Sequence, residues 1–258
     1  DEGVEKIIVG IGGSATNDGG AGMLQALGAL LLDANKQPIG AGGGCLQDLA
    51  AIDLSGLDKR LADVEIVVAC DVDNPLCGEK GASAVFGPQK GATAEMVQAL
   101  DSGLQHFAAL AARDLGLDIQ SPAGAGAAGG MGGGVLLLPD ARLQAGVKIV
   151  MEAVGLAEKV QDADLVITGE GRMDAQSVHG KTPIGVAHTA KAFGKPVIAI
   201  VGCLREDYEV VYAQGIDAVF PIIRQLGSLE EILQHGRDNL VSAAQNVARI
   251  YQMGISRK

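Results

Sequence analysis

The sequence has few of the residues that characterise several common classes of protein. It has no tryptophan, and aromatic residues make up only 3% of its 258 positions, so platforms on which bases could stack are scarce. Basic residues are in the minority, 20 against 31 acidic ones, which gives a formal net charge of -11. Because phosphate backbones repel an acidic surface, we do not expect a nucleic acid as partner.

Cysteines and long apolar runs are also sparse. The four cysteines follow neither a metal-ligand spacing nor the dense pattern of a disulfide framework. No apolar run reaches the roughly 20 residues that span a bilayer, and no secretory signal opens the sequence. These absences predict a cytoplasmic protein without a membrane partner. The first residue is Asp1 and not Met, from which we expect a fragment or a processed chain.

Glycine, in contrast, is abundant. The 38 glycines are roughly double the usual share of about 7%, which indicates loops shaped around ligands, although a core of small residues with tight turns explains part of the excess. The letters GIGGSATNDGGAG, at residues 10–22, follow the apolar run at residues 6–9. A strand that leads through such a loop into a helix start is suited to binding anions, because unpaired N–H groups point at the negative charge.

We therefore predict that this loop binds a phosphate or a carboxylate. The residues expected to do so are Gly12, Gly13, Ser14, Thr16 and Asn17. The loop is neither a Walker motif nor a strict GxGxxG. The alternative is a purely structural turn in which Asp18 caps the next helix.

Hydrophobic periodicity predicts an α/β protein. Buried strands are expected at residues 4–11, 64–70, 165–168, 197–201 and 218–222. Helices are expected at residues 20–33, 96–110, 143–154 and 183–193, the last capped by Thr182, with a closing helix that starts at a capping box of Ser228 and Glu231. The regular alternation in the last third predicts a parallel sheet, with ligand-binding loops at residues 169–181 and 202–206. The glycine-dense stretch at 122–134 is interpreted as a ligand-facing or hinge loop rather than a tether.

Two acidic residues follow the second predicted strand. Asp71 and Asp73 point the same way if the segment is extended, and Mg²⁺ prefers one or two carboxylates together with water and phosphate oxygens. The equal alternative is a pair of turn-forming aspartates beside Asn74. Lys80 and Lys90, set among glycines, are either phosphate-binding or simply solvated lysines.

Residues 168–185, TGEGRMDAQSVHGKTPIG, hold the highest density of chemical groups. They include the acids Glu170 and Asp174, the guanidinium of Arg172, the imidazole of His179 and the ammonium of Lys181. Phosphoryl transfer needs cations that absorb charge on the moving group and a carboxylate near the accepting hydroxyl. Arg172 is alternatively suited to a substrate carboxylate.

With these motifs in place, the sequence resembles the bacterial type I glycerate kinases. The resemblance is carried by residues 10–23, 69–83, 85–92 and 165–187 and extends over essentially the whole sequence. It implies phosphorylation of D-glycerate by ATP with Mg²⁺, most often to 2-phosphoglycerate, in the catabolism of organic acids such as glycerate, glyoxylate and glucarate. It also implies two dissimilar α/β domains with the site in the cleft between them. The family's upstream Asp-Ser-Phe/Tyr-Lys motif has no match here, so we expect catalysis to need a missing N-terminal segment.

On this basis we expect residues 1–145 to form a glycine-rich α/β domain. Residues 146–258 are expected to form a flavodoxin-like parallel-sheet domain that the N-terminal segment completes. The predicted catalytic residues are Asp174, Lys181 and Asp71, with Asp174 as the base and Asp71 as the alternative base. The predicted metal ligands are Asp71 and Asp73. We also predict that Lys90, Glu170 and Arg172 join the glycine loop in binding phosphate or substrate.

Two other functions stay open on the sequence alone. One is a nucleotide-linked oxidoreductase, since glycine loops after strands also bind dinucleotides. The other is a non-catalytic α/β protein that binds small anions. The sequence also leaves the oligomeric state open, with a homodimer among the options.

Overall fold

The computed structural model describes residues 3–178 and 181–255. The chain divides into two compact units, Asp1–Gly146 and Val147–Lys258, each with its own hydrophobic core. Both units combine parallel strands with helices, which confirms the predicted α/β class. No described helix is long and apolar enough to cross a membrane.

The first unit is built on a three-stranded parallel sheet, ordered β1-β4-β5. Its strands are β1 (Lys6–Gly10), β4 (Glu65–Ala69) and β5 (Ala141–Gln144). Gly10 pairs with Ala69, and Ala69 pairs with Gln144, so all three strands end at the same edge. The first glycine loop and the Asp71 segment leave the sheet from that edge.

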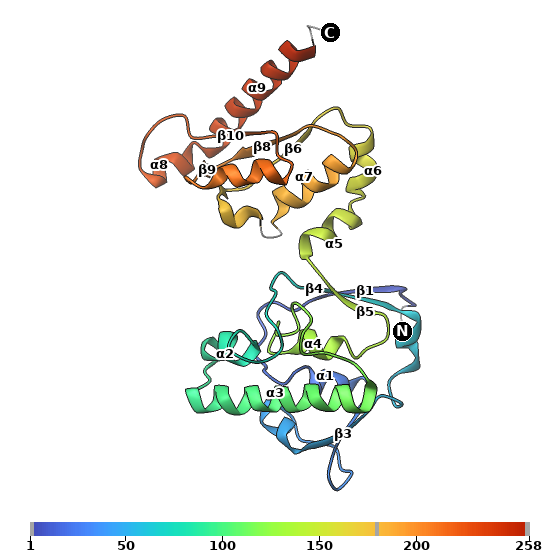
Figure 1. The fold of residues 1–258 in the computed structure, drawn as a ribbon. Coiled ribbons are helices and arrows are strands. Elements are labelled where there is room, and N and C mark those ends of the chain that lie inside the picture. Colours follow the sequence, from blue (N-terminus) through green and yellow to red (C-terminus); the bar gives the residue numbers. More distant parts are fainter. Residues whose placement is uncertain (1–2, 179–180, 256–258) are drawn as a thin grey trace. The chain divides into compact units, whose positions relative to one another are not determined.

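Helices and an antiparallel strand pair complete the first unit. They are α1 (Ala21–Ala26), α2 (Ala82–Phe86), α3 (Ala94–Leu115), α4 (Met131–Val135) and the antiparallel strand pair of β2 (Leu30–Asp33) with β3 (Leu49–Asp53). Figure 1 shows α1 and α4 between the sheet and α3. The side chains of Leu104 and Phe107, on the buried face of α3, are fully inaccessible and anchor the core.

The second unit has a three-stranded parallel sheet, ordered β10-β8-β6. These strands are β6 (Val166–Thr168), β8 (Val197–Val201) and β10 (Ala218–Pro221), and a short parallel pair, β7 (Arg172–Met173) with β9 (Cys203–Leu204), follows two of them. The helices are α5 (Gly146–Ala153), α6 (Leu156–Gln161), α7 (Thr182–Ala192), α8 (Leu229–Gln234) and α9 (Gly236–Ile255). The predicted strands of this unit, its parallel sheet and the capping box of Ser228 and Glu231 are confirmed.

Several predicted elements need correction. The strand at residues 4–11 is not buried: β1 is an edge strand, and the side chains of Ile7 and Ile8 are 39% and 51% exposed. The predicted helix at 20–33 ends at Ala26, because Gly28 has a φ of 102° and turns the chain into β2. The leucines of β2 fit a strand as well as a helical stripe, since an apolar run this short satisfies both periods.

Three smaller corrections concern helix boundaries. Leu143 lies in β5, so the helix predicted at 143–154 begins only at Gly146. The N-cap of α7 is Lys181 and not Thr182. The closing helix is interrupted at His235, which separates α8 from α9.

The stretch at 122–134 is neither a tether nor an open loop. It folds into tight turns and α4, and most of its residues are buried. A Cβ on Gly129 would lie 2.0 Å from the carbonyl oxygen of Thr16, and one on Gly134 would lie 2.1 Å from that of Gly19. These glycines therefore let the stretch pack directly against the backbone of the first glycine loop.

Candidate functional site

The glycine loop presents a row of unused hydrogen-bond donors. The backbone N–H groups of residues 12–16 donate to no other residue in the described part of the chain. After β1 ends at Gly10, the chain turns at residues 12 and 13, where Gly13 has a φ of 71°. A Cβ on Gly12 or Gly13 would have no neighbour within 4 Å, so neither glycine is required for internal packing. Unpaired N–H groups of this kind suit an anionic ligand.

Lys90 stands beside this loop. Its Nζ donates to Ser14 Oγ at 2.9 Å and to the carbonyl oxygen of Thr16 at 2.6 Å. Burial lowers the pKa of the Lys90 ammonium, and the nearby negative charge of Asp18 opposes that shift. The glycine turn that follows Lys90 is required, since Gly91 has a φ of 91°. Lys90 is therefore held with its ammonium at the loop.

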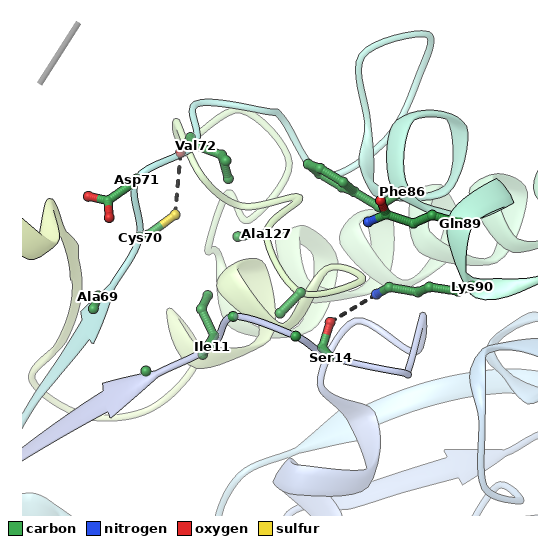
Figure 2. A pocket seen from close by; sticks show the side chains of 14 residues that line it. Ile11, Ser14, Ala69, Cys70, Asp71, Val72, Phe86, Gln89, Lys90 and Ala127 are labelled. Carbon is green, nitrogen blue, oxygen red and sulfur yellow. Dashed lines mark hydrogen bonds between the residues drawn. The ribbon is translucent and has the colours of Figure 1, made fainter. Parts of the chain in front are cut away.

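A hollow of about 440 Å³ brings several predicted residues together. Its lining includes Gly12, Gly13, Ser14 and Lys90 from the loop side and Asp71 from the end of β4. Figure 2 shows Asp71 and Lys90 at opposite ends of this hollow. Ala127 and Ala128 come from the stretch at 122–134 that was interpreted as ligand-facing. Sequence reasoning did not single out the other lining side chains, namely Ile11, Ala69, Cys70, Val72, Phe86 and Gln89.

The carboxylates after β4 do not share one environment. Asp71 Oδ1 accepts a hydrogen bond from the backbone N–H of Gly146 at 2.8 Å, while its Oδ2 has no partner among the described residues. Asp73 is exposed and does not line the hollow. No group of three or more His, Cys, Asp or Glu residues suited to a metal ion occurs in the described ranges. Asp71 is thus the carboxylate that could bind a cation together with ligand oxygens.

The remaining residues of the loop have structural partners. Asn17 donates to Ser83 Oγ at 2.8 Å, and its buried Oδ1 has no partner in the described part of the chain. Asp18 accepts from the N–H groups of Gly20 and Gly22, which fits the predicted role at the start of α1. Lys80 lies outside the hollow.

The cluster in the second unit is organised around Asp174, which is only 4% exposed. Arg172 Nε donates to its Oδ2 at 3.0 Å, and Lys181 Nζ lies 3.7 Å from its Oδ1. Burial raises the pKa of Asp174, but the charges of Lys181 and Arg172 and the N–H of Gln176 outweigh this and hold the pKa below its usual range. Asp174 is therefore an ionised carboxylate that holds two cations.

Glu170 is tied to the same loop through Ser177. The Ser177 hydroxyl donates to Glu170 Oε1, and Ser177 is completely buried. The loops after β6 and β8 are also joined, because the N–H of Gly202 donates to the carbonyl oxygen of Glu170. This confirms that the two loops meet at one edge of the sheet. His179, a weaker candidate, lies outside the described residues.

Comparisons with known proteins agree on one family. The model of the glycerate kinase family matches residues 1–252. Glycerate kinase of Haemophilus influenzae is 66% identical over 97% of this chain, and glycerate 2-kinase of Escherichia coli is 52% identical over 99% of it. A crystal structure from Salmonella typhimurium LT2, provisionally named glycerate kinase 2, matches 98% of this chain with a TM-score of 0.80 and 54% identity.

The chain spans 66% of the length of the H. influenzae protein and 66% of the chain in the Salmonella structure. The family model's match to residues 1–252 covers both units. The chain therefore belongs to the glycerate kinase family.

Proposed function

We propose that the protein containing this chain is an ATP-dependent glycerate kinase. It transfers the terminal phosphoryl group of ATP to a hydroxyl of D-glycerate, whose proton is released, and forms ADP and 2-phosphoglycerate in the catabolism of organic acids. The observation that carries the proposal is the row of unpaired N–H groups at residues 12–16 beside the Lys90 ammonium, in a chain of this family. The name of the E. coli relative supports the 2-position.

In the first unit, Gly12, Gly13, Ser14 and Lys90 would hold phosphate oxygens. Backbone N–H groups supply fixed donors, and the lysine adds a full charge that helps to neutralise the phosphate. Thr16 contributes its carbonyl oxygen to the position of Lys90. Asn17, bonded to Ser83, supports the shape of the loop rather than the ligand.

The residues at the end of β4 offer a magnesium ion one unengaged carboxylate oxygen. Mg²⁺ needs only one or two carboxylates when phosphate oxygens and water complete its shell, and Oδ2 of Asp71 is unengaged. Asp71 would hold the ion, with exposed Asp73 as the second candidate. When bound, the ion would neutralise charge on the transferring phosphoryl group.

In the second unit, Arg172 and Lys181 would stabilise anionic groups of the substrates. The salt bridges to Asp174 hold both cations at the edge of the sheet. The lowered pKa of Asp174 makes it a weak proton acceptor, which supports a positioning role for this carboxylate. Glu170, which accepts from Ser177, supports the same loop.

The test is a coupled assay of ADP release by the full-length protein with D-glycerate, ATP and Mg²⁺. We expect ADP release that depends on glycerate, and phosphorus NMR should identify 2-phosphoglycerate as the product. Binding of glycerate and of a non-hydrolysable ATP analogue without turnover would instead indicate a small-anion binder. Saturable binding of NADH would favour an oxidoreductase.

A further inference from the structure

The loop after β10 leaves the second sheet at the edge where the Asp174 cluster lies. β6, β8 and β10 are parallel, so their carboxyl ends share that edge. Arg224 follows the end of β10 by three residues. Neighbouring strands lie about 4.8 Å apart, so β6 and β10, on either side of β8, are separated by roughly 10 Å. Ligands of parallel sheets bind at this edge.

Arg224 lines a hollow of about 390 Å³ that is distinct from the hollow at the glycine loop. Its Nε donates to Asn239 Oδ1 at 2.7 Å, and Asn239, in the first turns of α9, is only 6% exposed. Arg224 itself is exposed, and this bond orients its guanidinium. It leaves the two Nη groups of Arg224 and the Nδ2 group of Asn239, which also lines the hollow, without a partner in the described part of the chain.

The charge of Arg224 is not neutralised by its bonded partner. Asn239 is a neutral amide, whereas Arg172, at the same sheet edge, is paired with a carboxylate. Glu231 also lines the hollow and keeps its negative charge there, while its Oε2 accepts from both the N–H and the hydroxyl of Ser228 in the capping box of α8. Because Asn239 is neutral, this bond leaves Arg224 its full charge and both Nη groups for a further acceptor.

We propose that Arg224 and Asn239 form an anion subsite that binds a carboxylate or phosphate group of one of the kinase's substrates. The identification of the ligand rests on the proposed function. The guanidinium Nη groups donate to two oxygens of the anion, and the Nδ2 group of Asn239 donates to one of them. The carboxylate of glycerate and the phosphates of ATP share this chemistry.

Two variants of the full-length protein separate a ligand role from a structural one. Arg224→Gln removes the charge. Asn239→Asp keeps an acceptor for Arg224 Nε, and so preserves the structural bond, but places a negative charge at the subsite. Arg237→Gln is the control, because it removes an exposed arginine of α9 that does not line the hollow.

The KM for glycerate is measured at saturating ATP, and the KM for ATP at saturating glycerate. We expect both test variants to raise one of the two KM values by about tenfold, equivalent to about 1.4 kcal/mol, with little change in kcat. A rise for glycerate identifies a carboxylate as the ligand, and a rise for ATP identifies a phosphate. The Arg237→Gln control should retain both wild-type KM values.

Calorimetric titration with D-glycerate, ATP and inorganic phosphate gives a readout that does not depend on turnover. Weaker binding by both variants supports the subsite even if the wild type transfers no phosphoryl group, in which case only the proposed function fails. Wild-type affinities in Asn239→Asp would overturn the proposal. If Arg224→Gln also lowered the thermal midpoint, the hydrogen bond between Arg224 and Asn239 would have a structural role only.

Discussion

At the scale of single residues, Lys90 is the cation that the candidate phosphate site of the first unit most depends on. Replacing it by methionine keeps much of the side-chain volume but removes the ammonium that bonds Ser14 and Thr16. We expect kcat/KM of the full-length enzyme to fall by at least about tenfold, or about 1.4 kcal/mol of transition-state stabilisation. Lys59→Met, at an exposed position away from the hollow, is the control. Equal kcat/KM values in the two variants would show that Lys90 does not contribute to phosphate binding or catalysis.

Lys181 tests the candidate site of the second unit. It is the N-cap residue of α7, and its ammonium lies 3.7 Å from Asp174. The positive end of the helix adds to its charge, so Lys181→Ala should lower kcat/KM by at least about tenfold. Lys195→Ala should leave kcat/KM unchanged, because the Lys195 ammonium forms no hydrogen bond or ion pair in the described residues. Steady-state kinetics measure both, and unchanged values for Lys181→Ala would exclude it from the mechanism.

The lowered pKa of the Asp174 carboxylate predicts that the free energy of unfolding depends on pH. Its folded-state pKa lies below the ordinary value of 3.8, so its ionised form stabilises the fold at neutral pH, and this contribution disappears as the pH falls below 3.8 through the folded-state value. Asp174→Asn cannot titrate. The difference in unfolding free energy between wild type and this variant should therefore be largest near neutrality and shrink in acid.

Denaturant titrations at a series of pH values measure that difference. Asp63→Asn provides a control, because Asp63 is exposed and its side chain forms no hydrogen bond or ion pair within the described ranges. Its stability difference should be small throughout. If the difference for Asp174→Asn stays constant from acid to neutral pH, the carboxylate does not stabilise the loop through its charge.

At the scale of elements, the glycines of the first unit have two separate roles. Gly134, in α4, packs on the glycine loop, because a Cβ there would lie 2.1 Å from the carbonyl oxygen of Gly19. Gly12 faces open space. We expect Gly134→Ala to destabilise the protein by about 1–3 kcal/mol, as overpacking does. Gly12→Ala should leave the thermal midpoint nearly unchanged and weaken ATP binding.

Thermal unfolding and calorimetric titration separate the two effects. Gly44→Ala is the control for both, since it lies outside the hollow and its Cβ would also meet no neighbour. A stable Gly134→Ala variant would contradict the close backbone packing of α4. Normal ATP affinity in Gly12→Ala would contradict the approach of phosphate to the loop.

At the scale of the whole chain, the two hydrophobic cores share no residue. Phe107 is fully buried in the first core, and a large-to-small change there typically costs about 3–5 kcal/mol. We therefore expect Phe107→Ala to reduce the hydrogen-exchange protection of β4 while leaving that of β8, in the second core, nearly as in the wild type. An equal loss of protection in both strands would show that the two units unfold as one.

Sequence reasoning was most accurate where one local signal dominates. The buried strands β4 and β8, the amphipathic helix α3 and the capping box of Ser228 and Glu231 were predicted at nearly their observed positions. It failed for β2, whose short apolar run fits both a strand and a helix, and for β5, whose sequence ARLQ carries no clear period; in both, the pairing partner decides.

The chemical groups of both candidate sites could be named from the sequence alone, although each pattern also had a structural alternative. Their partners could not be named. That Lys90 bonds Ser14 depends on segments 76 positions apart, and that Asn239 holds Arg224 depends on segments 15 positions apart. The sequence by itself thus determined the α/β class, the loops and the donors that each loop carries. Only the tertiary structure decided which donors remain unpaired, because hydrogen bonding and burial depend on contacts between distant segments that no local pattern encodes.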